Sequence, residues 1–339
     1  MIEFRTHPAL PTGARRGEWE LLADEDPNAT VFHGPRYLAV WHRTLAQATA
    51  IRVHTVHRDG RLIGVVADAN DRQGSPTGPV EVRRFQGGTE VTDYLGPISR
   101  PEDRSDIADA YVANLAADVD WDEFVAGGLA VDSGWVDALH RAADTHGLKI
   151  IQDDLEDVCP RVDLSGGHDA YLARLPGKLR QELTRKTRKL ARDAGDLKLV
   201  EVPPDQVAGE LDSFLDQAAA SVPEKAGFFR RADIHAWFRA LAEEFAGDGT
   251  FRLHRLDVGG LPAAATVSLV HNGEWGVYNS SFDPALGSLS PGIVIIGLLI
   301  QRAAESGCTT LDLLRGDEAY KYRFGAVDRR LERLTIVRG

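Results

Sequence analysis

The sequence contains little cysteine and lacks the short motifs that mark common hydrolases and metal sites. Its two cysteines, Cys159 and Cys308, lie far apart and form no CxxC pair, so neither a disulfide framework nor a zinc site is predicted. No GxSxG, HExxH, Walker A or GxGxxG pattern occurs. The eleven histidines form no evident ligand set, and no metal is expected. These absences disfavour hydrolase, metalloenzyme and dinucleotide-binding functions.

Long hydrophobic runs and an excess of positive charge are also missing. The longest apolar run, Ile293–Ile300, is much shorter than the roughly 20 residues that span a bilayer, so we expect a buried helix and no membrane insertion. The N-terminus lacks the layout of a secretory signal, which favours a cytoplasmic location. With 39 basic and 51 acidic residues the net charge is −12, which disfavours DNA binding by the chain as a whole.

The length of 339 residues predicts two domains. In the first half, two alternating apolar runs flank Asp59-Gly60 and predict a β-hairpin. The elements expected there are strands at 51–56, 62–67, 80–85, 91–98, 123–126 and 149–151, and helices at 101–117 and 133–146.

The second half repeats this order, with a hairpin around the turn at residues 259–262. Its expected strands are 197–202, 251–256, 263–270, 275–278, 309–314 and 333–337, and its helices 205–220, 232–245 and 290–306. Pro160 and Gly166-Gly167 place the boundary within 153–167. The sequence therefore predicts a mixed α/β fold of two units built on one plan, residues 1–160 and 168–339.

A dense group of charged and aromatic residues follows the strand predicted at 309–314. Arg315, Asp317, Glu318, Tyr320 and Lys321 come directly after this apolar segment. The carboxyl end of a central strand is where α/β sheets tend to bind ligands. The group is therefore a candidate active centre, with a solvated surface turn as the alternative.

The start of the helix predicted at 290–306 is a candidate phosphate site. Ser290 suits the N-cap, Pro291 suits the first helical position, and Gly292 lets a ligand approach the backbone N–H groups. Helix N-termini attract phosphate through unpaired donors and a partial positive charge. An ordinary capped helix remains the alternative.

A third feature is the only basic block, Lys178–Arg192, predicted as a helix with Leu179, Leu183 and Leu190 on one stripe. In an acidic chain such a helix would attract a phosphate-bearing ligand or an RNA backbone. Neutralisation by acidic neighbours in the fold is the alternative.

Together these motifs resemble the acetyltransferase-like domain of CelD-like proteins, a branch of the GNAT superfamily related to the Fem peptidoglycan aminoacyltransferases. The resemblance spans roughly Leu175–Phe324 and rests on residues 178–183, 281–283, 289–292, 314–318 and 320–325. It implies tandem GNAT-like domains, the first degenerate or a wall of the substrate site, the second holding the acyl donor between the strand at 275–280 and the helix at Gly292. Fem enzymes carry a lysine near the reacting carbonyl in an aromatic-Lys-x-x-Phe-Gly segment, and Lys321 matches it.

The working hypothesis is direct transfer of an acyl group, with acetyl-CoA as first candidate donor, to an amine of a small molecule or of a cell-envelope or natural-product precursor. Asp317 or Glu318 would act as base, Lys321 would stabilise the oxyanion, and Tyr320 or Tyr322 would act as acid. Donor contacts are expected from Asn279, Ser280, Ser290, Pro291 and Gly292, and acceptor contacts from Tyr278, Phe282, Asp283 and Arg315. Arg315 could instead form a structural pair with Asp312 or Asp317.

Two other functions remain open at this point. A Fem-type enzyme would use aminoacyl-tRNA as donor, bound through the Lys178–Arg192 helix. A non-catalytic binding protein would keep the fold without the chemistry. The sequence predicts no oligomeric state.

Overall fold

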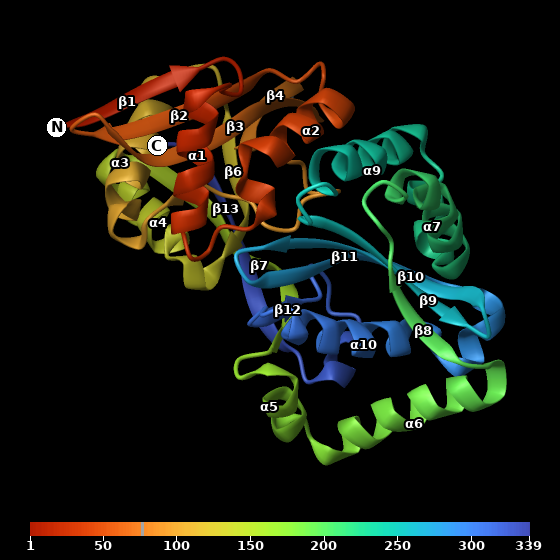
Figure 1. The fold of residues 1–339 in the computed structure, drawn as a ribbon. Coiled ribbons are helices and arrows are strands. Elements are labelled where there is room, and N and C mark those ends of the chain that lie inside the picture. Colours follow the sequence, from red (N-terminus) through yellow and green to blue (C-terminus); the bar gives the residue numbers. More distant parts are fainter. Residues whose placement is uncertain (76–77) are drawn as a thin grey trace. The chain divides into compact units, whose positions relative to one another are not determined.

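The chain folds into two compact units (Figure 1). A computed structural model describes residues 1–75 and 78–339. Unit 1 comprises Met1–Val158 and Arg329–Gly339, and unit 2 comprises Cys159–Asp328. Among the described residues, none of the helices has the length and apolar character needed to cross a membrane.

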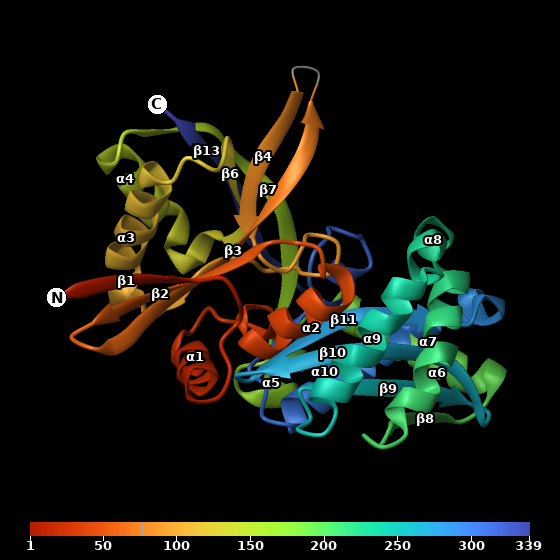
Figure 2. The same cartoon turned by 90° about the horizontal axis from the view of Figure 1, so that it is seen from above.

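Unit 1 is a mixed sheet with helices on its faces (Figures 1 and 2). Its strand order is β1-β2-β3-β4-β6-β13-β7, with the short β5 paired to β3. The strands are β1 (Ile2–His7), β2 (Ile51–Arg58), β3 (Arg61–Ser75), β4 (Gly78–Phe85), β5 (Ile98–Ser99), β6 (Glu123–Ala130), β7 (Leu148–Asp163) and β13 (Val327–Arg338). The helices are α1 (Ala14–Glu25), α2 (Pro35–Leu45), α3 (Arg104–Ala117) and α4 (Trp135–Thr145).

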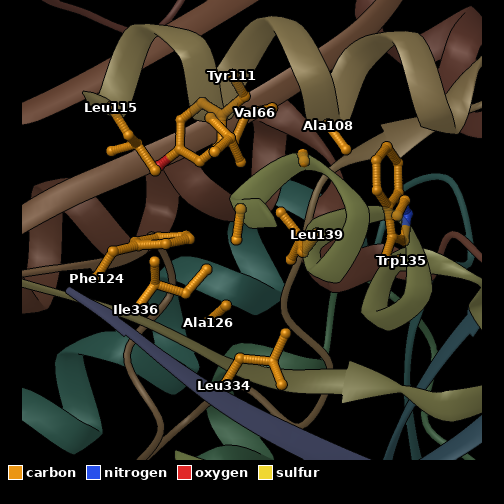
Figure 3. Packing of buried hydrophobic residues seen from close by; sticks show 14 of the residues in the cluster. Val66, Ala108, Tyr111, Leu115, Phe124, Ala126, Trp135, Leu139, Leu334 and Ile336 are labelled. Carbon is orange, nitrogen blue, oxygen red and sulfur yellow. The ribbon is translucent and has the colours of Figure 1, made fainter. Parts of the chain in front are cut away.

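The core of unit 1 lies between α3, α4 and the sheet (Figure 3). Phe124 and Ala126 of β6 face the same cluster as Leu334 and Ile336 of the last strand. Because β13 pairs with β6, the C-terminus of the chain completes the sheet of the first unit. The expected second domain ran to residue 339, whereas residues 329–339 belong to unit 1.

Unit 2 has the strand order β7-β12-β11-β10-β9-β8, in which β7 continues from unit 1. Its elements are α5 (Gly167–Arg174), α6 (Gly177–Ala194), β8 (Leu197–Glu201), α7 (Val207–Ser221), α8 (Ala226–Phe229), α9 (Ala232–Phe245), β9 (Phe251–Val258), β10 (Leu261–His271), β11 (Glu274–Phe282), α10 (Pro291–Glu305) and β12 (Thr310–Asp312). Helices α7 and α9 pack on one face of this sheet, while α10, with α5 and α6 against it, packs on the other (Figure 1). Short 3₁₀ helices at Pro284–Leu289 and Lys321–Phe324 flank α10 and β13.

The two units repeat one hairpin, β2–β3 and β9–β10, at positions 200 residues apart in the numbering. His54 pairs with Val66, and His254 pairs with Thr266. Both turns use two residues at positive φ, with Gly60 at 82° and Gly260 at 85° in the second position. Two such residues form the turn that matches the twist of a hairpin, which is why Asp-Gly and Gly-Gly predict it. The tandem α/β architecture predicted from the sequence is confirmed.

Two expected strands differ from the structure, while the expected boundary agrees with it. Residues 91–97 form no strand, because they turn back on the chain, with the Val91 carbonyl accepting from Tyr37 Oη at 2.5 Å. The division between the units, at Val158 and Cys159, falls within the expected range 153–167 and inside β7, where Pro160 is tolerated and its carbonyl accepts from the Leu313 amide at 2.9 Å. The strand predicted at 309–314 is reduced to β12, because the chain turns at Leu314.

Candidate active site

Strands β11 and β12 run parallel and then diverge. They pair over three positions, Glu274–Gly276 with Thr310–Asp312. Beyond these, β12 has ended while β11 continues to Phe282, paired with β10 on its other side. The register with β10 shifts at Tyr278, since Val267 pairs with Asn279 and Ser268 with Val277. Within the described residues, the edge of β11 that pairs with β12 therefore has no ladder partner beyond Gly276.

The segment after β12 is a constrained turn. Asp312 is fully buried, and its Oδ1 accepts from the Leu314 amide at 2.7 Å. Leu314 has a φ of 56°, which is unusual for a residue with a Cβ. Gly316 has a φ of 109°, and a Cβ placed there would lie 2.6 Å from Oε2 of Glu318. The turn therefore requires glycine at 316 and leaves Glu318 close to the backbone.

Lys321 holds this turn together. Its side chain is 3% exposed, and its Nζ donates to the carbonyl oxygens of Leu314, Arg315 and Gly316 at 2.9, 2.8 and 3.0 Å. The same nitrogen lies 2.9 Å from Oε2 of Glu318. An ammonium has three protons, and these four acceptors occupy them. The geometry places Lys321 as a support of the loop, with its charge directed away from solvent.

Glu318 and Tyr320 are held in different protonation states by this arrangement. Burial raises the pKa of Glu318, but the hydrogen bond and charge of Lys321 outweigh it and the net pKa lies below its usual range. Burial, together with the charge of Glu318, raises the pKa of Tyr320 to about 12, although a hydrogen bond with Ser280 opposes the rise. At neutral pH the site therefore presents a carboxylate beside a protonated phenol that reaches β11.

The N-terminus of α10 differs from its expected form. Pro291 occupies the first turn as predicted, but the Ser290 side chain makes no capping hydrogen bond. Instead Ser290, at a φ of 59°, accepts from Nζ of Lys186 at 2.8 Å. Burial, followed by the charge of Arg323, lowers the pKa of Lys186. Lys186 therefore places a positive charge at the start of α10. The sequence predicted Lys186 only as part of the basic helix 178–192, because no local spacing indicates a contact with Ser290.

Gly292 lies next to Phe282, so that an added Cβ would be 3.5 Å from Cδ1 of that ring. The end of β11 and the start of α10 are therefore in contact, and the 3₁₀ helix Pro284–Leu289 connects them. Asp283 caps that segment, accepting from the Ala285 amide at 2.9 Å. This local hydrogen bond accounts for Asp283 without a substrate.

The other predicted site residues divide between the two faces of the sheet. The Tyr278 hydroxyl accepts from Nε1 of Trp237 at 3.1 Å, on the side of α9. The irregularity at Tyr278 breaks the alternation along β11, and beyond it Ser280 shares the opposite face with Phe282, which packs in the α10 core. Asn279 and Arg315 are partly exposed and Asp317 is exposed. The structure brings Ser280, Glu318, Tyr320 and Lys321 together, and it separates Tyr278 from them.

Helix α6 presents a basic face to solvent, as predicted. The surface over it is hollowed by about 640 Å³ between long side chains, those of Arg180, Arg185, Arg188, Lys189 and Arg192 with Gln181 and Thr184. Part of the charge is neutralised, since Asp193 lies 3.4 Å from Lys189 and 2.7 Å from Arg192. Within the described residues no cluster of three or more potential metal ligands occurs.

Part of the chain matches a known family by sequence, and the whole chain matches solved structures by fold. Residues 177–322 match the acetyltransferase (GNAT) domain family. No curated protein sequence matches the chain. The crystal structure of FemX superposes with a TM-score of 0.65 at 11% identity, covering 95% of this chain and 96% of that chain.

Two further solved structures share the fold over most of their length. A conserved protein of unknown function from Bacteroides thetaiotaomicron has a TM-score of 0.61 at 14% identity, with 100% of both chains covered. L-PGS from Bacillus licheniformis has a TM-score of 0.54 at 10% identity, covering 95% of this chain and 91% of that chain. Residues 177–322 of the chain therefore match the acetyltransferase (GNAT) domain family by sequence, and the chain as a whole has the fold of these solved structures.

Proposed function

We propose that unit 2 transfers an acyl group from acyl-CoA to the amine of a small molecule. The observation that carries this proposal is that pairing between β11 and β12 ends at Gly276 and Asp312, with Tyr320 hydrogen-bonded to Ser280 on the continuing part of β11. Backbone N–H groups on the unpaired edge of β11 would face a thioester carbonyl placed there and stabilise its oxyanion. Lys186, bound to Ser290 at the start of α10, would add positive charge for the phosphates of the donor.

In this reaction the amine nitrogen attacks the thioester carbon, a C–N bond forms, and the C–S bond breaks. The tetrahedral intermediate loses one proton from its nitrogen, and the departing thiolate gains one. Glu318, ionised at neutral pH, or Asp317 beside it would take the first proton through water. Tyr320 remains protonated and would supply the second. Lys321 would act by holding the 314–316 turn rather than by contacting the oxyanion, because its protons already meet acceptors.

The direct test is turnover with a panel of acyl-CoA donors and amine acceptors, read as release of free thiol. The proposal requires binding of at least one acyl-CoA, measured as a thermal shift, and loss of thiol release when the amine is omitted. Absence of both donor binding and turnover would instead favour a non-catalytic binding protein.

A second candidate, transfer from aminoacyl-tRNA, is favoured by the exposed basic face of α6. Binding of tRNA to the intact protein should then weaken as salt rises. Neutralising Arg185 and Lys189 should reduce both the affinity and the slope of its salt dependence. Salt-insensitive binding, or none, would leave acyl-CoA as the donor.

A further inference from the structure

A cavity of about 700 Å³ in unit 1 takes no part in the chemistry proposed for unit 2. It lies between α1, the segment Pro8–Thr12 and the β1–β2 edge of the sheet. These elements can be followed in Figure 1, where α1 crosses the strands β2 and β3. Cavities of this size are typical of small-molecule sites in proteins.

One side of the cavity is apolar. It is lined by Trp19, Val53 and Val65, which are at most 2% exposed, together with Leu10 and Leu62. This surface is already shaped by a packed core, so a bound group would meet a preformed wall. An alkyl or aromatic body suits this part of the cavity.

The other side is polar and basic. Arg5 and His7 of β1 and Thr55 and His57 of β2 line it, because alternate residues of a strand share one face. Arg15 of α1 lines it as well. Two acidic residues lie near: Glu3, which forms an ion pair with Arg5 at 2.7 Å, and Glu18, which belongs to the lining.

Two histidines in this wall have unused hydrogen-bonding capacity. Within the described residues, the buried Nδ1 of His57 has no hydrogen-bond partner. Nε2 of His7 makes a long contact of 3.3 Å to the Thr55 hydroxyl. His57 Nδ1 is closed to solvent, so the weakly bonded Nε2 of His7 is the nitrogen with spare capacity toward the cavity.

The two histidines of this wall have lowered pKa values. Burial lowers the pKa of His7, and Arg15, Arg5 and His54 lower it further. Burial also lowers the pKa of His57, as do Arg5 and His7, whereas Glu3 and Glu18 act in the opposite direction. Both imidazoles are thus neutral at neutral pH and able to take up a proton when a negative charge arrives.

We propose that this cavity is a second ligand site, which binds a small organic carboxylate with an apolar body. The carboxylate would lie between His7, His57 and Arg15, and the body would contact Leu10 and Leu62, which are partly exposed. The site stands apart from the proposed transferase reaction, since every residue involved belongs to unit 1.

Titration calorimetry with octanoate on the intact protein tests the proposal, with octanol and octylammonium as probes of the same apolar body. We expect octanoate to bind more tightly than either by about tenfold or more, and more tightly at pH 6 than at pH 8. Titrations in buffers of different ionisation heat should show net proton uptake on binding.

His57→Gln and Arg15→Gln should each weaken octanoate binding by about tenfold, and His57→Gln should reduce the proton uptake. Arg15 is exposed, so its variant should fold even if His57→Gln does not. The matched controls are His146→Gln, directly after α4, and Arg16→Gln, whose partners Asp109 and Glu20 lie outside the lining. Equal affinity for octanoate and octanol, or unchanged affinity in both test variants, overturns the proposal. Neither result bears on thiol release by unit 2.

Discussion

Nζ of Lys321 lies 2.9 Å from the carbonyl oxygen of Leu314, seven residues earlier, where the backbone has a φ of 56°. The lysine therefore stabilises a backbone conformation that the leucine alone disfavours. This contact links the segment Tyr320-Lys321 to the chain that follows β12.

Replacing Lys321 by methionine should keep the volume of the side chain but leave three carbonyls and a carboxylate without their donor. We expect a loss of about 2 to 4 kcal/mol in the free energy of unfolding, measured by urea denaturation. Lys225→Met is the control, since Lys225 is 61% exposed and 3.8 Å from Glu318. Unchanged stability together with a large fall in kcat would restore a direct role in the chemistry.

Gly316→Ala should destabilise unit 2 because the added Cβ meets Glu318 and the φ of 109° is unfavourable for alanine. We expect the free energy of unfolding to fall by about 1 to 3 kcal/mol, which is measured as a lower Tm. Gly297→Ala, in the middle of α10 with nothing within 4 Å of the new Cβ, should be neutral or stabilising. Equal effects of the two substitutions would contradict the constrained turn.

Tyr320→Phe should lower kcat by about tenfold to a hundredfold if the phenol protonates the leaving group. Tyr322→Phe should change kcat little, because the Tyr322 hydroxyl bonds to Asp328 at 2.8 Å in an exposed position. The reverse order of effects would transfer the acid role to Tyr322.

The raised pKa of Tyr320 predicts that the stability of the protein changes at high pH. Its pKa is raised from 10 to about 12 on folding, so its contribution is complete below pH 10 and is lost as the pH rises to about 12. The difference in unfolding free energy between wild type and Tyr320→Phe should therefore shrink over this window. A constant difference from pH 9 to pH 12 would refute the raised pKa.

Lys186→Met should raise the KM for acyl-CoA by about tenfold through loss of positive charge at the start of α10. Lys198→Met, at an exposed position of β8, is the control and should leave KM unchanged. If both variants bind the donor equally well, the phosphates lie elsewhere.

Asp68→Asn should be strongly destabilising in unit 1. The carboxylate is fully buried and accepts from Arg52 and His54 at 2.9 Å and from Tyr111 at 2.8 Å. We expect a loss of about 3 to 5 kcal/mol in the free energy of unfolding, as found when one partner of a buried ion pair is removed. Asp71→Asn, at an exposed position, is the control and should change the free energy of unfolding little.

The pKa of Asp68 gives this substitution a pH dependence. Burial raises the pKa, but the hydrogen bond from His54 and the charges of His54, Arg52 and Arg83 outweigh it, and the net pKa is lowered. The contribution of the carboxylate is therefore present above its unfolded pKa near 3.8 and is lost as the pH falls further. Wild type and Asp68→Asn should converge in stability at acid pH, and a gap that persists there would contradict this account.

The sequence by itself determined the elements whose signals are local. Asp59-Gly60 and Gly259-Gly260 set the hairpin turns, since few residue pairs tolerate two positive φ angles. The run at 293–300 determined a buried helix, and the spacing of leucines at 179, 183 and 190 determined the side of α6 that packs. The sequence also predicted that Glu318, Tyr320 and Lys321 lie close together, because only two residues separate the first from the last.

Only the tertiary structure decided what depends on distant partners. The return of β13 to unit 1 rests on pairing with β6, some 200 residues earlier, for which no local pattern exists. Lys186 donates to Ser290, which lies 104 residues later in the chain. Ser280 forms a hydrogen bond with Tyr320 because β11 continues past the point where β12 ends. The direction of the Lys321 ammonium, toward the carbonyls of its own loop, follows from backbone angles at Leu314 and Gly316 that residue identity alone does not fix.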